Sequence, residues 1–261
     1  MFKELYEIME LTSEADKRIL SPKVIYNETF LLSLIMFWFN KQSNFIVNSD
    51  LDRKICKALQ LIDDEARFYT RATLETPFKV RKKGEKDPLA EASSNVSAVC
   101  GHFNVLYGKK KERIVLKQNA KQFIVLETTL DKQLKKGTKK FKTYNQIARD
   151  VGCMIQSLSR LENKFLDHLG LFVIAPEQIL KHESFRTYTY KPNIEELVIK
   201  RQEGYFENLD FVELFQKLFQ RIDVDCISYE DILRYIKKND SYYSEKLLGF
   251  YEICLRFNGL R

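Results

Sequence analysis

The pattern of hydrophobic and polar positions is clearest between residues 121 and 166. Four consecutive apolar residues, two of them β-branched, run from Phe123 to Leu126 and are followed by Glu127. A short, bounded apolar run of this kind predicts a strand buried on both faces. After a lysine-rich loop, apolar residues recur with a 3.6-residue spacing from Tyr144 to Phe165, which predicts a long amphipathic helix. We expect the strand, the basic loop and the helix to form one unit.

The predicted helix also carries a polar stripe roughly opposite its apolar one. The stripe consists of Gln146, Arg149, Gln156 and Arg160. A solvated polar face is the simpler interpretation of such a stripe, and a functional surface beside the carboxylate of Glu127 is the alternative.

The rest of the chain predicts a mixed sheet with helices on its faces. A hairpin followed by a right-handed helical crossover to a parallel strand is the expected arrangement of the core. We expect an α/β core at residues 76–190, a helical region at residues 1–75 packed on it, and a second helical region at residues 191–261. In chain order, the pattern first predicts helices over residues 1–20, 27–40 and 48–73. Strands over residues 99–107 and 113–117 come next, followed by the central strand and the long helix. After the helix we expect Gly170 as its C-cap, a strand over residues 171–175 and an edge strand over residues 222–227.

Composition narrows the class of protein. The chain has 261 residues and is 44% hydrophobic, so a folded core is expected and disorder is not. Its longest apolar run, from Phe30 to Phe39, is about ten residues, whereas about 20 are needed to span a bilayer. No signal peptide is recognisable.

Five scattered cysteines without a CxxC pair predict free thiols and a cytoplasmic location, and the three histidines lack zinc-like spacing.

The positive charge of the chain is concentrated in one window. Between Lys79 and Lys142 there are 17 Lys/Arg and six Asp/Glu, a balance of +11. Since the whole chain carries +7, all other residues together sum to −4. Lysine runs are often only solvated turns, but their concentration around the central strand indicates a surface for nucleic acid or another polyanion.

The order helix, three strands, helix, strand, with a carboxylate ending the third strand, resembles the core of the restriction-endonuclease-like, or PD-(D/E)XK, nuclease superfamily. Several local segments also resemble a group of bacterial proteins predicted to be such nucleases. The resemblance spans about residues 25–175 and implies an α/β core of helix, three-stranded meander, helix and strand. It also implies a bacterial defence or restriction-type context. The segments are DPLAE (87–91), GHF (101–103), QFIVLE (122–127), the Gly137-Thr138 turn and YNQIARDVGCM (144–154).

Nucleases of this superfamily hold a divalent metal with an Asp and with the Glu of a Glu-x-Lys pair on adjoining strands. By this resemblance Glu127 is the metal-binding Glu. Gln146 matches a helix Gln that supports the site and contacts substrate. Arg149, on the same predicted helix, also matches the family's pattern. Thr129 stands where the family has its lysine, and a threonine hydroxyl carries no charge.

The adjoining strand also lacks the expected aspartate, because no Asp or Glu occurs between Glu91 and Glu112. Glu91 would then have to supply the second carboxylate from the preceding segment. A loop lysine, Lys132 or Lys135, would have to replace the missing ammonium.

We therefore favour a nuclease-like protein whose catalytic site has decayed, and which binds nucleic acid, DNA rather than RNA, or a protein partner through its C-terminal helices. It would need no cofactor and would not be an enzyme. One alternative is an active Mg²⁺-dependent endonuclease with relocated residues, and another is a protein-interaction module without a nucleic-acid function. The candidate site residues are Glu127, Glu91 and Gln146 for catalysis, Glu127 and Glu91 for metal, and Lys132, Lys135, Lys136, Lys139, Lys140 and Arg149 for nucleic acid.

Overall fold

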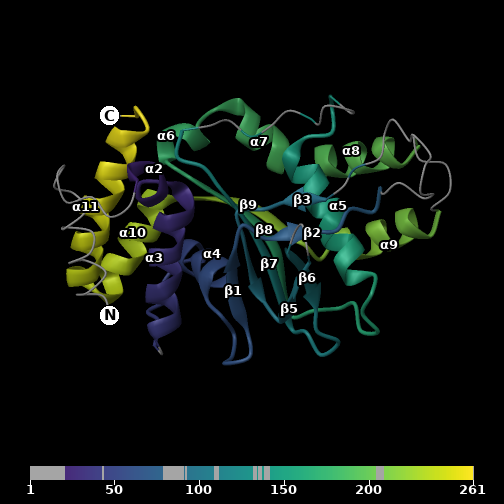
Figure 1. Cartoon of the computed structure of the whole chain (residues 1–261), viewed down its shortest axis with the longest axis horizontal. Helices are drawn as coiled ribbons and strands as arrows, with labels where there is room; N and C mark the ends of the chain where they lie inside the picture. Colours follow the sequence, from purple (N-terminus) through teal and green to yellow (C-terminus); the bar gives the residue numbers. More distant parts are fainter. Residues whose placement is uncertain are drawn as a thin grey trace.

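The computed structural model describes residues 21–42, 44–78, 91, 93–108, 112–131, 134, 137, 142–203 and 209–260. The described part is a mixed α/β protein, as predicted (Figure 1). The helix predicted at residues 1–20 lies outside the described residues. In chain order the elements are α2 (Pro22–Ile25), α3 (Glu28–Lys41), α4 (Asp50–Leu59), β1 (Arg67–Thr70), β2 (Thr73–Leu74), β3 (Ser94–Asn95), β4 (Ala98–Gly101), β5 (Phe103–Tyr107), β6 (Glu112–Leu116), β7 (Gln122–Thr128), α5 (Gln146–Leu158), β8 (His168–Ala175), α6 (Glu177–Leu180), α7 (Glu183–Thr189), α8 (Lys191–Glu203), α9 (Leu209–Phe219), β9 (Asp223–Ser228), α10 (Tyr229–Asn239) and α11 (Ser241–Phe257).

The main sheet has five strands in the order β1-β4-β7-β8-β9. Strand β7 lies at its centre, antiparallel to β4 and parallel to β8. Every residue of β7 is buried, which is what a continuous apolar run requires. The predicted central strand is therefore confirmed, with hydrogen-bonded neighbours on both sides. The predicted edge strand is confirmed as β9, which pairs in parallel with β8.

Helices cover both faces of this sheet (Figure 1). Because side chains alternate along a strand, Phe123 and Val125 of β7 pack into a core with α5, α7, α8 and α9. Their neighbours Ile124 and Leu126 pack into a second core with α3, α4, α10 and α11. The direction of each β7 side chain thus follows from its position in this alternation, and Glu127 is in phase with Val125, on the α5 side.

Residues 48–73 were expected to form one helix, and this expectation is wrong. Helix α4 begins as predicted, with the Ser49 hydroxyl accepting a hydrogen bond from the Asp52 amide, but it ends at Leu59. Asp63 then accepts backbone hydrogen bonds in a turn, and the chain continues as β1 and β2. Apolar residues at 62, 66 and 69 happen to continue the helical spacing, whereas the pairing of β1 with β4 decides the structure.

The three-stranded meander also differs from the expectation. The strand predicted over residues 99–107 is interrupted between β4 and β5, where Gly101 has φ +134°. Strand β4 pairs with β7, whereas β5 pairs with β6 in a separate two-stranded sheet. In the described residues β6 pairs with β5 alone, so the hairpin is confirmed and its continuous pairing with the central strand is not.

The long helix is shorter than predicted. Asn145 caps α5 by accepting a hydrogen bond from the Ala148 amide, and the helix ends at Leu158 rather than near Phe165. Gly170 is not a helix cap. It lies within β8, paired with Ile124, where an added Cβ would come 2.7 Å from the Phe172 ring.

The five-stranded sheet draws on all three of the expected regions, because β1 comes from residues 1–75 and β9 comes from residues 191–261. All five cysteines are free, as predicted. No helix in the described part of the chain is long and apolar enough to cross a membrane.

Candidate functional site

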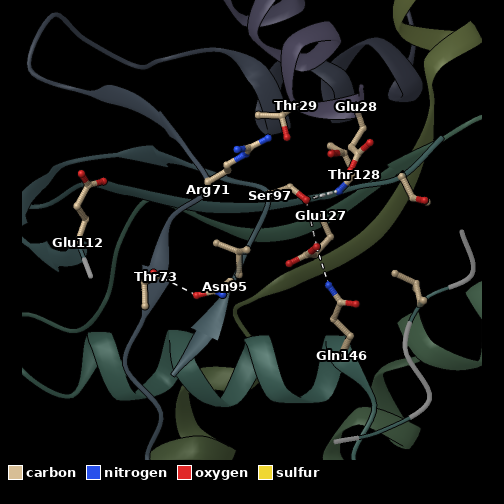
Figure 2. Close-up of a pocket in the computed structure, with 13 residues that line it drawn as sticks. Glu28, Thr29, Arg71, Thr73, Asn95, Ser97, Glu112, Glu127, Thr128 and Gln146 are labelled. Carbon is tan, nitrogen blue, oxygen red and sulfur yellow. Dashed lines mark hydrogen bonds between the residues drawn. The ribbon is translucent and has the colours of Figure 1, made fainter. Parts of the chain in front are cut away.

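The carboxyl group of Glu127 is buried at the end of β7 and is held by neutral donors. Its Oε2 atom accepts a hydrogen bond of 2.7 Å from Gln146 Nε2 and one of 3.2 Å from Ser97 Oγ. Figure 2 shows these donors reaching Glu127 from opposite sides. The same Ser97 hydroxyl accepts a hydrogen bond of 2.9 Å from the Thr128 amide, which fixes its orientation. The Glu127 side chain is only 4% exposed.

A second buried carboxyl group, that of Asp150, lies near Glu127, close enough for its charge to affect the pKa of Glu127. Asp150 lies one turn after Gln146 on α5 and is fully buried. Its Oδ1 atom accepts a hydrogen bond from Ser94 Oγ. Two nitrogens of Arg149, Nε and Nη2, donate to that same Ser94 hydroxyl over 3.1 and 2.8 Å. The guanidinium group of Arg149 therefore binds the hydroxyl that orients Asp150.

The pKa values of both acids are raised, chiefly because both groups are buried. Burial, followed by the charge of Asp150, raises the pKa of Glu127 well above its usual range. Burial also raises the pKa of Asp150, to about 6, although the Arg149 charge and the Ser94 hydrogen bond act in the opposite direction. The remaining oxygens, Glu127 Oε1 and Asp150 Oδ2, have no donor partner. If both acids were ionised their charges would repel each other, and a proton or a cation bound between them would relieve that repulsion.

A cavity of about 590 Å³ opens over Glu127. Its wall is rich in hydroxyl and amide groups, and Thr129 is one of its residues. Among the described residues that line it, Arg71 is the one cationic side chain. The cavity is lined by Glu28, Thr29, Arg71, Thr73, Asn95, Val96, Ser97, Glu112, Glu127, Thr128, Thr129, Leu134 and Gln146, most of them labelled in Figure 2.

The structure brings together Glu127, Gln146 and Arg149 of the predicted site residues. Glu91 does not line the cavity, although it lies near enough to Asp150 for its charge to raise the pKa of that group. It accepts a hydrogen bond from Thr76 Oγ1 and lies 3.8 Å from Nε of Arg201, which is completely buried over the Phe78 ring. Glu91 is thus the counter-ion of a buried arginine. The predicted nucleic-acid-binding residues Lys132, Lys135, Lys136, Lys139 and Lys140 lie outside the described residues.

Sequence reasoning missed Asp150. The available signal was its spacing, because residues four apart on a helix share a face and Asp150 follows Gln146 by four. The family resemblance places the second carboxylate on the adjoining strand, whereas the segment leading into β4 supplies Asn95 and Ser97 to the cavity instead.

Among the described residues, no group of three or more His, Cys, Asp or Glu side chains is arranged to hold a metal ion. Comparisons with protein-family models, with curated proteins and with solved structures gave no match to this chain.

Proposed function

We propose that this chain is a divalent-metal-dependent phosphodiesterase acting on nucleic acid, whose second carboxylate is supplied by helix α5. The observation that carries the proposal is the neighbourhood of two buried carboxyl groups, Glu127 in the wall of the polar cavity and Asp150 behind it on α5. From the sequence alone a decayed site is favoured, because the adjoining strand offers no carboxylate. Asp150 removes that objection, and Glu91 is not needed.

The residues present fit a divalent cation. Two buried carboxyl oxygens, one each from Glu127 and Asp150, have no donor. Mg²⁺ is commonly bound by only one or two carboxylates, with water and substrate phosphate oxygens completing its shell. Such an ion would polarise the phosphate and lower the pKa of a bound water.

The surrounding residues orient the two carboxyl groups. Gln146 and Ser97 occupy Glu127 Oε2, which leaves Oε1 for a cation. Ser94 occupies Asp150 Oδ1 in the same way, and Arg149 holds Ser94. Each acid thus keeps one oxygen fixed by neutral donors and one oxygen available, which is a preorganised arrangement.

The choice of nucleic acid as the substrate rests on two further features. The described core combines a hairpin, a buried strand ending in Glu127, the crossover helix α5 and the parallel strand β8, which agrees with the element order behind the nuclease resemblance. The charge balance of +11 between Lys79 and Lys142 surrounds this strand in the sequence and suits a polyanionic substrate.

The test is incubation of the full chain with DNA and RNA in Mg²⁺ or Mn²⁺, with Mn²⁺ binding measured separately by calorimetry. We expect metal-dependent cleavage, with Glu127→Gln and Asp150→Asn each lowering the rate at least about a hundredfold, equivalent to about 2.7 kcal/mol of transition-state stabilisation. Both variants should also weaken Mn²⁺ binding. Glu162→Gln, at an exposed carboxylate away from the cavity, is the matched control. A wild-type chain that neither cleaves nor binds Mn²⁺ would contradict the proposal.

The second candidate is a nuclease-like binding subunit with a decayed site. It is favoured by Thr129, which lines the cavity and carries no charge where the resembling enzymes have lysine. This candidate predicts salt-dependent binding of DNA that requires no metal and leads to no cleavage. A pure protein-interaction module would bind neither, and the exposed side chains of Tyr242, Leu248 and Phe257 on α11 suit a protein partner.

A further inference from the structure

Arg71 has an unusual backbone conformation beside the candidate site. It lies at the corner between β1 and β2 with φ +53°, the only non-glycine residue with positive φ among the described residues. An arginine is strained in this left-handed region, which glycine adopts freely. The corner is held from both sides, because the Arg71 amide donates to the Ser97 carbonyl over 2.7 Å and the Val96 amide donates to the Ala72 carbonyl over 2.9 Å.

The guanidinium group of Arg71 is exposed and is not committed to another side chain. Within the described part of the chain it makes no hydrogen bond, ion pair or ring contact. The other acids of the cavity wall, Glu28 and Glu112, are not within ion-pair distance of it, and Glu112 accepts the Tyr69 hydroxyl instead. In Figure 2 the Arg71 side chain extends towards Thr29, at the start of α3. Its N–H donors therefore remain available to an anion in the cavity.

One residue connects Arg71 to the buried acids. The Ser97 carbonyl accepts the Arg71 amide, and the Ser97 hydroxyl donates to Glu127 Oε2. The arginine backbone and the Glu127 carboxyl group are thus anchored to the same residue. The strained corner between β1 and β2 therefore places the Arg71 cation in the wall of the cavity.

We infer that Arg71 binds a phosphate group of the substrate in this cavity and supplies the positive charge that Thr129 lacks. The inference deepens the proposed function and rests on it for the identity of the substrate. Guanidinium is suited to this role because its planar fork can donate two parallel hydrogen bonds to a phosphate. The hydroxyl and amide groups of Thr73, Asn95 and Ser97 would complete a polar wall around the bound group.

The test compares Arg71→Gly, Arg71→Lys and Arg67→Ala with the wild type, using a fluorescein-labelled 20-base-pair DNA duplex in Ca²⁺. Glycine relieves the backbone strain, so Arg71→Gly should fold at least as stably as the wild type. We expect it nevertheless to bind the duplex about tenfold more weakly and to reduce the log–log salt slope by about 0.9, the value for one lost phosphate contact. Arg71→Lys should restore the slope but only part of the affinity. Arg67, exposed at the start of the preceding strand β1 but outside the cavity wall, is the matched control.

The outcomes separate this inference from the proposed function. Wild-type affinity and slope in Arg71→Gly, or equal losses in Arg71→Gly and Arg67→Ala, would overturn the role of Arg71 even if Glu127→Gln abolishes cleavage. Conversely, a selective loss of slope in Arg71→Gly would support the phosphate contact even if the wild-type chain cleaves nothing. In cleavage assays of an active enzyme, Arg71→Gly should lower kcat as well as raise KM, because the charge stabilises the transition state.

Discussion

At the scale of single residues, the pairing of Glu127 with Asp150 decides the chemistry of the site. Both carboxyl groups are buried, and their fixed partners are neutral groups: Gln146, Ser97 and Ser94. Burial raises the pKa of each acid, and the charge of Asp150 raises that of Glu127 further, so the folded protein holds a proton that the unfolded chain releases at the same pH. Stability therefore falls as pH rises above the ordinary carboxyl range, through the raised pKa of about 6 for Asp150 and beyond.

Replacement of Glu127 by Gln should remove the loss of folding stability that ionisation of Glu127 causes at high pH. An amide at position 127 keeps the shape of the side chain and can donate to Asp150, so two like charges no longer meet. In a metal-free buffer with chelator, the variant should match or trail the wild type near pH 4 and exceed it by roughly 1–3 kcal/mol at pH 8. Urea denaturation at both pH values measures this, with Glu162→Gln as the exposed control. A stability difference that does not change with pH would show that the pair shares no proton.

At the scale of elements, β7 could be predicted from the run Phe123 to Leu126, because a bounded apolar run with burial on both faces leaves little choice. Its hydrogen-bonded contact with Gln146 was expected through the family resemblance alone. The apolar periodicity did not point to Asp150, because a buried acid within an amphipathic helix looks like an interruption of the apolar face, and only its four-residue spacing from Gln146 marked it. The error at residues 60–73 has a similar origin, since the identity of β1 depends on pairing with β4, which is distant in the sequence.

The break between β4 and β5 gives a direct test of the backbone geometry at Gly101. Gly101 has φ +134°, and an added Cβ would lie 2.0 Å from the Gln122 carbonyl oxygen. Because that oxygen belongs to the central strand and accepts the His102 amide, it has little freedom to move. Gly101→Ala should therefore destabilise the fold by more than about 3 kcal/mol.

Gly249 is the matched control for this substitution, because it lies within α11 and an added Cβ would meet no atom within 4 Å. Gly249→Ala should stabilise the protein by about 0.5–1 kcal/mol through helix propensity. Chemical denaturation of both variants gives the comparison. A Gly101→Ala protein as stable as the wild type would mean that β4 and β5 do not separate at this point.

At the scale of the whole molecule, the sheet joins segments that looked separate in the sequence. Strand β1 comes from the region expected to be only helical at the N-terminus, and β9 comes from the C-terminal region. The buried ion pair of Arg201 with Glu91 similarly connects α8 to the segment before β3. Composition shifts place such regions along the chain, but they carry no information about which distant strand completes a sheet. The excess positive charge between Lys79 and Lys142 is different, because it can be counted from the sequence without any structure.

The last prediction concerns that window. If four of its loop lysines contact phosphates, changing Lys135, Lys136, Lys139 and Lys140 to Gln should weaken duplex DNA binding and flatten the log–log salt slope by up to roughly 3–4 units, about 0.9 per contact. The control carries the same change in net charge at exposed lysines outside the window, with Lys181, Lys200, Lys237 and Lys246 changed to Gln. A positive surface acts through local counter-ion release, so the control should keep the wild-type slope. Equal flattening in both variants would instead indicate a response to net charge alone. An unchanged slope in both variants would indicate that DNA binds at another surface, or would favour the protein-interaction hypothesis.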